Sequence, residues 1–341
     1  MASKFQLSDL SVPVIAAPMA GGPSTPELAA AATNAGGLGF VAAGYLSADT
    51  FAERVVAARK LTSGPVGVNL FVPQPSTGMP AEIQGYAAAL SGDAERYGVA
   101  LGEPRHDDDG WSAKFDAVLD LRPEVVSFAF GLPARDGCDR LRGAGIVTLA
   151  TVTTVPEAEL ATGRGVDALV VQGPGAGGHR GTYDPAAQAA TQPLAELLSA
   201  VLAVVDVPVV ATGGLMTAED VEGVVRAGAV AAQLGTAFLL SDEAGSSPVH
   251  RAALRDPQFI ETVVTKAFSG RYARGLRNRF IEQHEAEAPL GYPEIHYLTS
   301  PLRAASVRAG DPHATNIWAG TGFQKARLAS VATIMEGLSC R

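Results

Sequence analysis

Short apolar segments recur along the chain as far as Leu234, and most are followed by a segment with the pattern of a helix. We expect strands at Val14–Ala17, Leu38–Val41, Val66–Asn69, Val125–Phe128, Ile146–Ala150, Ala168–Val171, Val209–Ala211 and Ala231–Leu234. Their hydrophobicity is nearly continuous, which is typical of parallel strands covered on both faces. Eight βα units in one chain predict a (β/α)8 TIM barrel, because a doubly wound sheet usually contains fewer units.

Two segments interrupt this rhythm and predict insertions into the barrel. Residues 72–110 separate the third expected strand from its helix, and residues 241–320 contain six prolines without helical periodicity. Helices are expected at Thr25–Asn34, Ala48–Leu61, Ala113–Leu121, Thr217–Ala227 and Gln324–Met335, the last of which would complete the eighth unit. We therefore expect a barrel from residues 1–240, including the 72–110 insertion and completed by 321–341, and a smaller substrate-covering domain at 241–320.

Charge and cysteine content exclude several classes of partner. Lys and Arg number 26 against 35 Asp and Glu, and the resulting net charge of −9 argues against nucleic acid and anionic membranes. Cys138 and Cys340 provide neither a disulfide framework nor the spacing of a metal site. Neither a signal peptide nor a membrane span is recognisable, so we expect a cytoplasmic protein with a small-molecule substrate.

Glycine-containing turns follow the last two expected strands of the barrel. Gly213 and Gly214 come after Val209–Ala211, and Gly235 and Thr236 come after Ala231–Leu234. The active site of such a barrel lies at the carboxyl ends of its strands, where backbone N–H groups of these turns can bind phosphate. The pair of turns therefore predicts a phosphorylated substrate or a phosphate-bearing cofactor such as FMN, although either turn alone could be an ordinary connection.

The loop after Ala168–Val171 contains the best catalytic candidate. Gly173, Gly175 and Gly178 have the spacing of a dinucleotide fingerprint, but loop residues follow where the fingerprint requires a helix, so we reject that interpretation. His179 lies in this loop and can act as a general base or bind an anion near neutral pH. The alternative is a histidine that only hydrogen-bonds the loop.

Other charged residues are given structural interpretations. His284 and His296 could reach the site from the 241–320 segment, although we expect both on the surface. We expect Asp107–Gly110 to be a solvated turn and not a calcium loop, and no zinc or iron cluster is evident. A basic run in Phe268–Phe280 could face an anionic substrate or phosphate, but we expect most of its arginines to pair with nearby carboxylates; they are Arg271, Arg274, Arg277 and Arg279.

With these loops in view, the chain resembles the nitronate monooxygenase family, formerly called 2-nitropropane dioxygenases, which are FMN-dependent barrel enzymes. The resemblance covers nearly the whole chain and rests on the segments Ala17–Gly22, Asn34–Gly39, Val68–Leu70, Ala176–Gly181, Ala211–Gly214, Gln233–Thr236, Ser269–Arg271 with Ala273–Arg274, and Trp318–Gly320. The sequence departs from the family pattern at Gly175, where an acidic residue is frequent, and at Thr321, where a glutamine is frequent.

The resemblance implies a site and a reaction. His179 would be the catalytic residue, and FMN would contact Pro18, Met19, Asn69, Gln172, Gly177, Gly213, Gly214, Gln233, Leu234, Gly235 and Thr236. The implied reaction is the oxidation of an alkyl nitronate, with propionate 3-nitronate and nitroalkanes as candidates, by O₂ to a carbonyl compound and nitrite. The alternatives are a flavin-dependent NAD(P)H enoyl reductase of fatty-acid synthesis, an FMN-free barrel isomerase or aldolase, and a non-catalytic flavin-binding protein.

Overall fold

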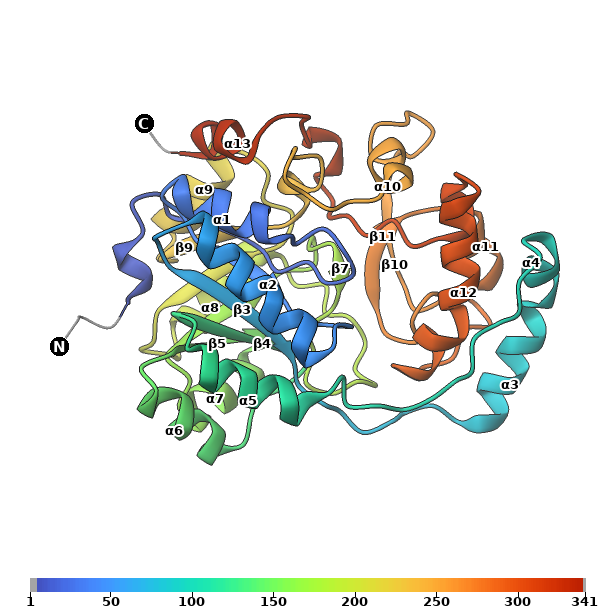
Figure 1. Ribbon diagram of the computed structural model, residues 1–341, viewed down its shortest axis with the longest axis horizontal. Coiled ribbons are helices and arrows are strands. Elements are labelled where there is room, and N and C mark those ends of the chain that lie inside the picture. Colours follow the sequence, from blue (N-terminus) through green and yellow to red (C-terminus); the bar gives the residue numbers. More distant parts are fainter. Residues whose placement is uncertain (1–4, 340–341) are drawn as a thin grey trace.

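The computed structural model describes residues 5–339, and its central feature is a barrel of eight parallel strands (Figure 1). The strands are β1 (Val14–Ala16), β2 (Gly39–Ala42), β3 (Val66–Phe71), β4 (Val125–Ala129), β5 (Val147–Val152), β6 (Ala168–Gln172), β8 (Val209–Thr212) and β9 (Ala231–Leu234). They are ordered β1-β9-β8-β6-β5-β4-β3-β2, and the bridge between Ile15 and Leu38 joins the two ends. The predicted (β/α)8 barrel is therefore confirmed.

A helix follows each barrel strand and packs outside it. These helices are α1 (Pro26–Asn34), α2 (Ala48–Leu61), α5 (Trp111–Leu121), α6 (Arg135–Gly143), α7 (Val155–Arg164), α8 (Leu194–Leu202), α9 (Ala218–Arg226) and α13 (Val331–Leu338). Several begin at a capping side chain, as in α1, where the Thr25 hydroxyl accepts a hydrogen bond from the N–H of Leu28 at 3.0 Å. Such caps satisfy N–H groups that have no partner within the helix.

Apolar side chains close the amino-terminal end of the barrel. Leu7, from the short 3-10 helix η1 (Leu7–Asp9), packs with Leu38, Val125 and Val147 near the beginnings of the strands. Phe40 and Leu149 fill the interior above them. Because this end is packed, only the carboxyl ends of the strands can form a deep site.

A second lobe faces those carboxyl ends. It contains a three-stranded sheet of β7 (Gly178–His179), β11 (Ala273–Leu276) and β10 (Thr262–Thr265), with helices α10 (Pro248–Ala253), α11 (Arg279–His284) and α12 (Glu294–Arg308). Helices α3 (Pro80–Ala89) and α4 (Ser91–Arg96) of the 72–110 insertion also pack here, beside α11 and α12 (Figure 1). The Tyr86 hydroxyl donates to the carbonyl of Ala267 at 2.7 Å, so the insertion and the 241–320 segment share an apolar core.

The expected helix Gln324–Met335 is wrong in its first half. A 3-10 turn, η4 (Phe323–Lys325), ends at an extended Ala326, and α13 begins only after Ser330, whose hydroxyl accepts from the N–H of Thr333. The intervening chain is extended because Ala329 forms a bridge with Ser241. Periodicity alone does not reveal such a tertiary pairing.

Two sequence expectations concern membranes and cysteines. Between residues 5 and 339, every helix is too short or too polar to cross a bilayer. Cys138 is a buried free thiol, whereas Cys340 lies outside the described residues.

Candidate active site

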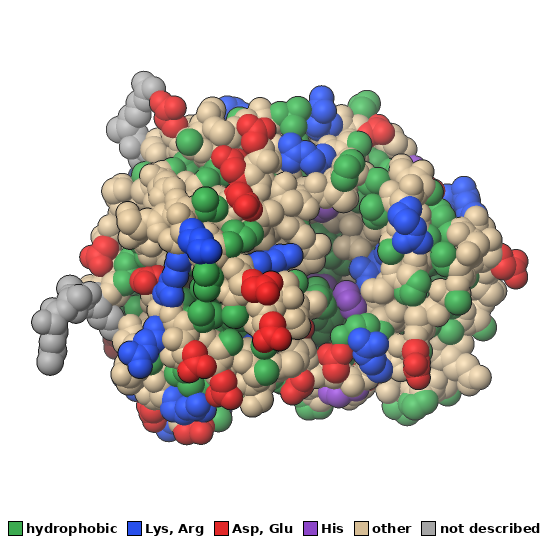
Figure 2. Space-filling model, in the orientation of Figure 1, with side chains coloured by type: hydrophobic (Ala, Val, Ile, Leu, Met, Phe, Trp, Pro, Cys, Tyr) green, Lys and Arg blue, Asp and Glu red, His purple; other side chains and the backbone are tan. Residues whose placement is uncertain are grey.

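A cavity of about 710 Å³ lies between the carboxyl ends of the barrel strands and the second lobe. Figure 2 shows a hollow between the two lobes, with histidine side chains visible inside it. Its lining includes every site residue expected from the sequence, namely Pro18, Met19, Asn69, Gln172, Gly177, His179, Gly213, Gly214, Gln233, Leu234, Gly235 and Thr236. The fold thus brings residues from the carboxyl ends of five barrel strands, and from the segments that follow them, to one cavity, whose volume suits a sizeable organic ligand.

His179 lies on this cavity at the pairing of β7 with β11. Its Nε2 is 2.9 Å from the Ser269 hydroxyl oxygen, and that hydroxyl donates its own hydrogen to the carbonyl of Arg271 at 3.2 Å. Ser269 must therefore accept from His179, which places the imidazole proton on Nε2. Nδ1 has no hydrogen-bond partner within residues 5–339, so its lone pair is available to a ligand.

Burial and two positive charges keep this imidazole neutral. The rings of Tyr292, Trp318 and Phe130 surround it, with centroids 5.5, 5.6 and 6.0 Å away. Burial, together with the charges of Arg271 and Arg303, lowers the pKa of His179 to about 3. The ring can therefore accept a proton or a hydrogen bond throughout the neutral pH range.

Buried arginines hold the His179 loop in place. Arg271 donates to the carbonyl of Arg180 at 3.2 Å and to the carbonyl and hydroxyl of Thr182 at 2.6 and 3.0 Å. Arg180 donates to the carbonyls of Gly173 and Gln172 at 2.6 and 3.1 Å. Burial lowers the pKa of both guanidinium groups to about 10, so both remain charged at neutral pH. Because the hydrogen-bond partners of Arg271 are neutral, its positive charge acts on His179 without a carboxylate beside it.

The four arginines of the Phe268–Phe280 basic run therefore have two kinds of partner, carboxylates or backbone carbonyls. Arg277 lies 3.2 Å from Glu261, and Arg279 lies 3.8 Å from Asp93, as expected for ion pairs. Arg274, in contrast, donates to the carbonyl of Pro174 at 2.9 Å, and Arg271 donates to the His179 loop. The expectation of carboxylate pairing is wrong for these last two.

On the same cavity, the two glycine turns present backbone donors. Gly213 and Gly214 have φ values of +124° and +80°, which favour glycine. The N–H groups of Gly214, Gly235 and Thr236 donate to no acceptor in the described part of the chain. Nearby, the Ser246 hydroxyl oxygen is buried without a partner among the same residues. Free donors and an unsatisfied hydroxyl suit an anionic, oxygen-rich group.

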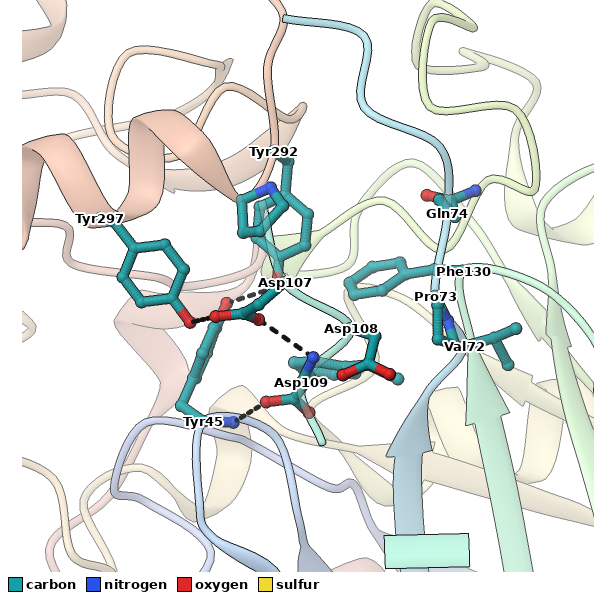
Figure 3. Close-up of a pocket in the computed structure, with 12 residues that line it drawn as sticks. Tyr45, Val72, Pro73, Gln74, Asp107, Asp108, Asp109, Phe130, Tyr292 and Tyr297 are labelled. Atoms are coloured by element: carbon teal, nitrogen blue, oxygen red, sulfur yellow. Dashed lines mark hydrogen bonds between the residues drawn. The ribbon is translucent and has the colours of Figure 1, made fainter. Parts of the chain in front are cut away.

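Aromatic residues form the wall on the side of the 72–110 insertion. Figure 3 shows Tyr45 beside a small pocket bordered by Asp107, Asp109 and Tyr292. Tyr45 has a φ of +67°, and its backbone N–H donates to a carboxylate oxygen of Asp109 at 2.9 Å. Asp109 also forms an ion pair with Lys114 at 2.7 Å. The Tyr292 hydroxyl donates to that of Tyr45 at 3.0 Å. The aspartates expected in a solvated turn thus support the cavity wall, and no metal-binding group of His, Cys, Asp or Glu occurs within residues 5–339.

Comparisons with known proteins agree with this geometry. The sequence profile of the nitronate monooxygenase family matches residues 4–340. The chain belongs to this family. A probable nitronate monooxygenase of Staphylococcus aureus (strain JH9) is 36% identical over 340 residues, which is 98% of this chain and 95% of the relative. Nitroalkane oxidase from Streptomyces ansochromogenes is 47% identical, with a TM-score of 0.94 over 97% of this chain and 96% of that one. The resemblance expected from the sequence is confirmed, and the protein is an oxidoreductase of the nitronate monooxygenase family.

A more distant structure shares the fold alone. FabK from Thermotoga maritima is 23% identical, with a TM-score of 0.76 over 97% of this chain and 93% of that one. This likeness therefore carries no information on the reaction.

The two departures from the family pattern are in contact in this family member. Thr321 donates its N–H to the carbonyl of Gly175 at 3.1 Å. A Cβ added at Gly175 would lie 2.9 Å from the Thr321 hydroxyl oxygen and 3.2 Å from the carbonyl of Gly213. With its present neighbours, position 175 therefore has no room for a larger side chain, and the two departures form one local arrangement.

Part of the cavity lining carries no signal that was recognised in the sequence. His296 was expected on the surface but lines the cavity, and His284 is buried 2.7 Å from Asp93. Arg303 and Tyr45 also line the cavity, although neither belongs to a recognisable motif. The expected lack of helical periodicity in residues 241–320 is wrong for α12 (Glu294–Arg308), a 15-residue helix that contains Pro301 and carries both His296 and Arg303.

We expect Gly177→Ala to destabilise this family member. A Cβ at position 177 would lie 2.5 Å from the carbonyl carbon of Ala319 and 2.6 Å from the nitrogen of Gly320, so backbone must move. The free energy of unfolding should fall by about 1–3 kcal/mol in chemical denaturation. Gly163→Ala, in α7 with open space around its Cβ, is the control and should leave stability equal or slightly raised. Equal stability of the Gly177→Ala variant and the wild type would contradict this packing.

Proposed function

We propose that this enzyme oxidises alkyl nitronates, and nitroalkanes after deprotonation, with O₂ to a carbonyl compound and nitrite, using FMN and no NAD(P)H. The observation that carries the proposal is the neutral His179, with a free Nδ1, in a cavity that is also lined by unpaired backbone donors. Family membership and the likeness to a nitroalkane oxidase support the same reaction class. An acidic protein with two separate cysteines also supports the proposed cytoplasmic location.

The residues present fit FMN. The free N–H groups of Gly214, Gly235 and Thr236, with the unsatisfied Ser246 hydroxyl, are suited to its phosphate. Pro18, Met19 and Asn69 line the same cavity and would hold the ring end. When bound, the flavin supplies the redox chemistry by accepting electrons from the substrate and passing them to O₂.

The protein's own groups would perform the proton transfer. In a neutral nitroalkane, the bond between the α-carbon and its hydrogen breaks, the proton moves to Nδ1 of His179, and the electron pair delocalises into the nitro group. The imidazolium formed lies in the positive field of Arg271 and Arg303. Transfer is therefore favourable only while the negative nitronate remains beside it. The 241–320 segment, as the proposed substrate-covering domain, would exclude water from this step.

The proposal is tested on the purified protein by its absorbance and by its oxygen uptake. We expect the visible absorbance of a flavin, and oxygen consumption with stoichiometric nitrite when propionate 3-nitronate or ethylnitronate is added without NADH. A colourless protein that cannot be reconstituted with FMN would contradict the cofactor. NADH oxidation driven by an enoyl thioester, without nitrite release from nitronates, would favour the enoyl reductase alternative.

A further inference from the structure

Arg303 is a cation that lines the cavity, and it comes from helix α12 of the second lobe. Its Nε donates to the Thr299 hydroxyl at 3.0 Å, and its Nη1 donates to Asn316 Oδ1 at 2.9 Å. Its Nη2 donates to the carbonyl of His296 and the Ser300 hydroxyl, both at 2.9 Å. These partners are all neutral, and burial lowers the pKa of Arg303 to about 10, so it remains charged at neutral pH.

The guanidinium group retains a free donor. Nη1 carries two N–H bonds, and Asn316 is its one acceptor among residues 5–339. A half-buried cation with an unused donor on a cavity is costly unless an anion or water completes its hydrogen bonds. Arg303 is also close enough to His179 for its charge to lower the pKa of that imidazole. Arg303 and His179 line one cavity, so the free donor of Arg303 and the proposed base can serve the same ligand.

His296 supplies a second donor beside Arg303. Its Nδ1 lies 3.2 Å from Nη2 of Arg303, and because a guanidinium can only donate, Nδ1 must be the acceptor. Burial and the charge of Arg303 lower the pKa of His296 to about 2, so the ring is neutral and carries its proton on Nε2. Its ring stacks on Tyr45 with a centroid distance of 4.3 Å, which fixes its orientation on the cavity wall.

We propose that Arg303 and His296 bind the two oxygens of the substrate's nitronate group, next to His179. This inference rests on the proposed function and adds the residues that receive the substrate's charge. The ligand class is a small planar oxyanion, which includes the nitronate group and the nitrite product. Nη1 of Arg303 and Nε2 of His296 donate to the oxygens, so the negative charge that develops on deprotonation forms beside a cation. A carboxylate on the substrate's tail has similar chemistry, and the test separates these two sources.

The first test measures binding without turnover. Sodium nitrite is titrated by calorimetry into the protein as purified, for the wild type and for Arg303→Gln and Arg303→Lys. We expect nitrite affinity to fall at least tenfold in Arg303→Gln and to recover partly in Arg303→Lys, which keeps the charge without the planar fork. Arg255→Gln is the control, because it removes one exposed charge of the second lobe that lies outside the cavity lining, and its affinity should stay within twofold. Wild-type nitrite affinity in Arg303→Gln would overturn the proposal.

The second test identifies the oxyanion. Ethylnitronate has no carboxylate, whereas propionate 3-nitronate has one, so a nitronate site predicts at least a tenfold loss of kcat/KM for both in Arg303→Gln. A loss confined to propionate 3-nitronate would assign Arg303 to the carboxylate and overturn the proposal. Should Arg303→Gln fail to fold, Arg303→Lys and His296→Gln decide, and wild-type nitrite affinity in both would reject the site. Nitrite binding that depends on Arg303 in a protein unable to oxidise nitronates would refute the proposed function and leave the anion site standing.

Discussion

His179→Asn should lose about 10²- to 10⁴-fold in turnover of neutral nitroalkanes, which is the range a positioned general base contributes. Asparagine keeps an amide N–H that can donate to Ser269 but has no group that can take the proton. Turnover of a preformed nitronate, which needs no deprotonation, should fall less than tenfold. Oxygen consumption with nitroethane and with ethylnitronate, measured on the same preparation, gives both rates.

The difference between the two substrates is the informative quantity. Loss of binding or folding would lower both rates together, whereas loss of a base affects the neutral substrate alone. His106→Asn is a suitable control, because this histidine is 43% exposed and lies 3.6 Å from Glu294, outside the cavity lining, and both rates should be unchanged. Full nitroethane activity in His179→Asn, with flavin content equal to the wild type, would remove His179 from the role of base.

Because the pKa of His179 is lowered to about 3, the neutral base form predominates above that pH in the free enzyme. Protonation of His179 should therefore not reduce the nitroalkane rate of the wild type between pH 5 and 8. If instead the nitroalkane rate decreases as the pH is lowered through 6.5, the pKa of an ordinary histidine, then burial and the charges of Arg271 and Arg303 lower the pKa of His179 less than the structure indicates.

The barrel and its glycine turns could be predicted because their causes are local. A parallel strand is recognisable by its continuous hydrophobicity. The turn after β8 is recognisable by Gly213 and Gly214, because their positive φ values are ones that glycine adopts readily. All twelve expected site residues line one cavity for the same reason, since a barrel brings the carboxyl ends of its strands together. Their individual roles toward a cofactor stay predictions.

The second lobe could not be predicted, because its causes are long-range. Arg271 holds a loop some 90 positions away in the sequence, through the carbonyls of Arg180 and Thr182, and nothing near Arg271 reports this. His296 and Arg303 face the cavity because α12 packs across the barrel mouth, whereas isolated polar residues suggest a surface. The error in the first half of the expected helix Gln324–Met335 has a similar origin in the pairing of Ala329 with Ser241.

Gly235→Val should weaken flavin binding about 100-fold while leaving the folded apoprotein nearly as stable as the wild type. Gly235 has a φ of −107°, which any residue can adopt, and an added Cβ would meet Met19 and Ala17 at 3.4 and 3.5 Å, which are ordinary contacts. The protein itself therefore accepts a side chain there. The proposed phosphate does not, because valine methyl groups would occupy the space in front of the N–H groups of Gly235 and Thr236. Loss of two hydrogen bonds to a charged group costs about 3 kcal/mol, which corresponds to about 100-fold in Kd.

The contrast with Gly214→Ala separates cofactor exclusion from strain. Gly214 has a φ of +80°, and a Cβ there would lie 2.8 Å from the Thr321 hydroxyl oxygen, so this variant should lose stability even without flavin. Flavin affinity is measured by fluorescence titration of the apoprotein with FMN, and stability by thermal unfolding of the same apoprotein. If Gly235→Val binds FMN as tightly as the wild type, the phosphate does not lie at this turn. If the Gly235→Val apoprotein loses as much stability as that of Gly214→Ala, glycine is required at position 235 by the packing of the protein itself. A weaker FMN affinity would then not show that the phosphate lies at this turn.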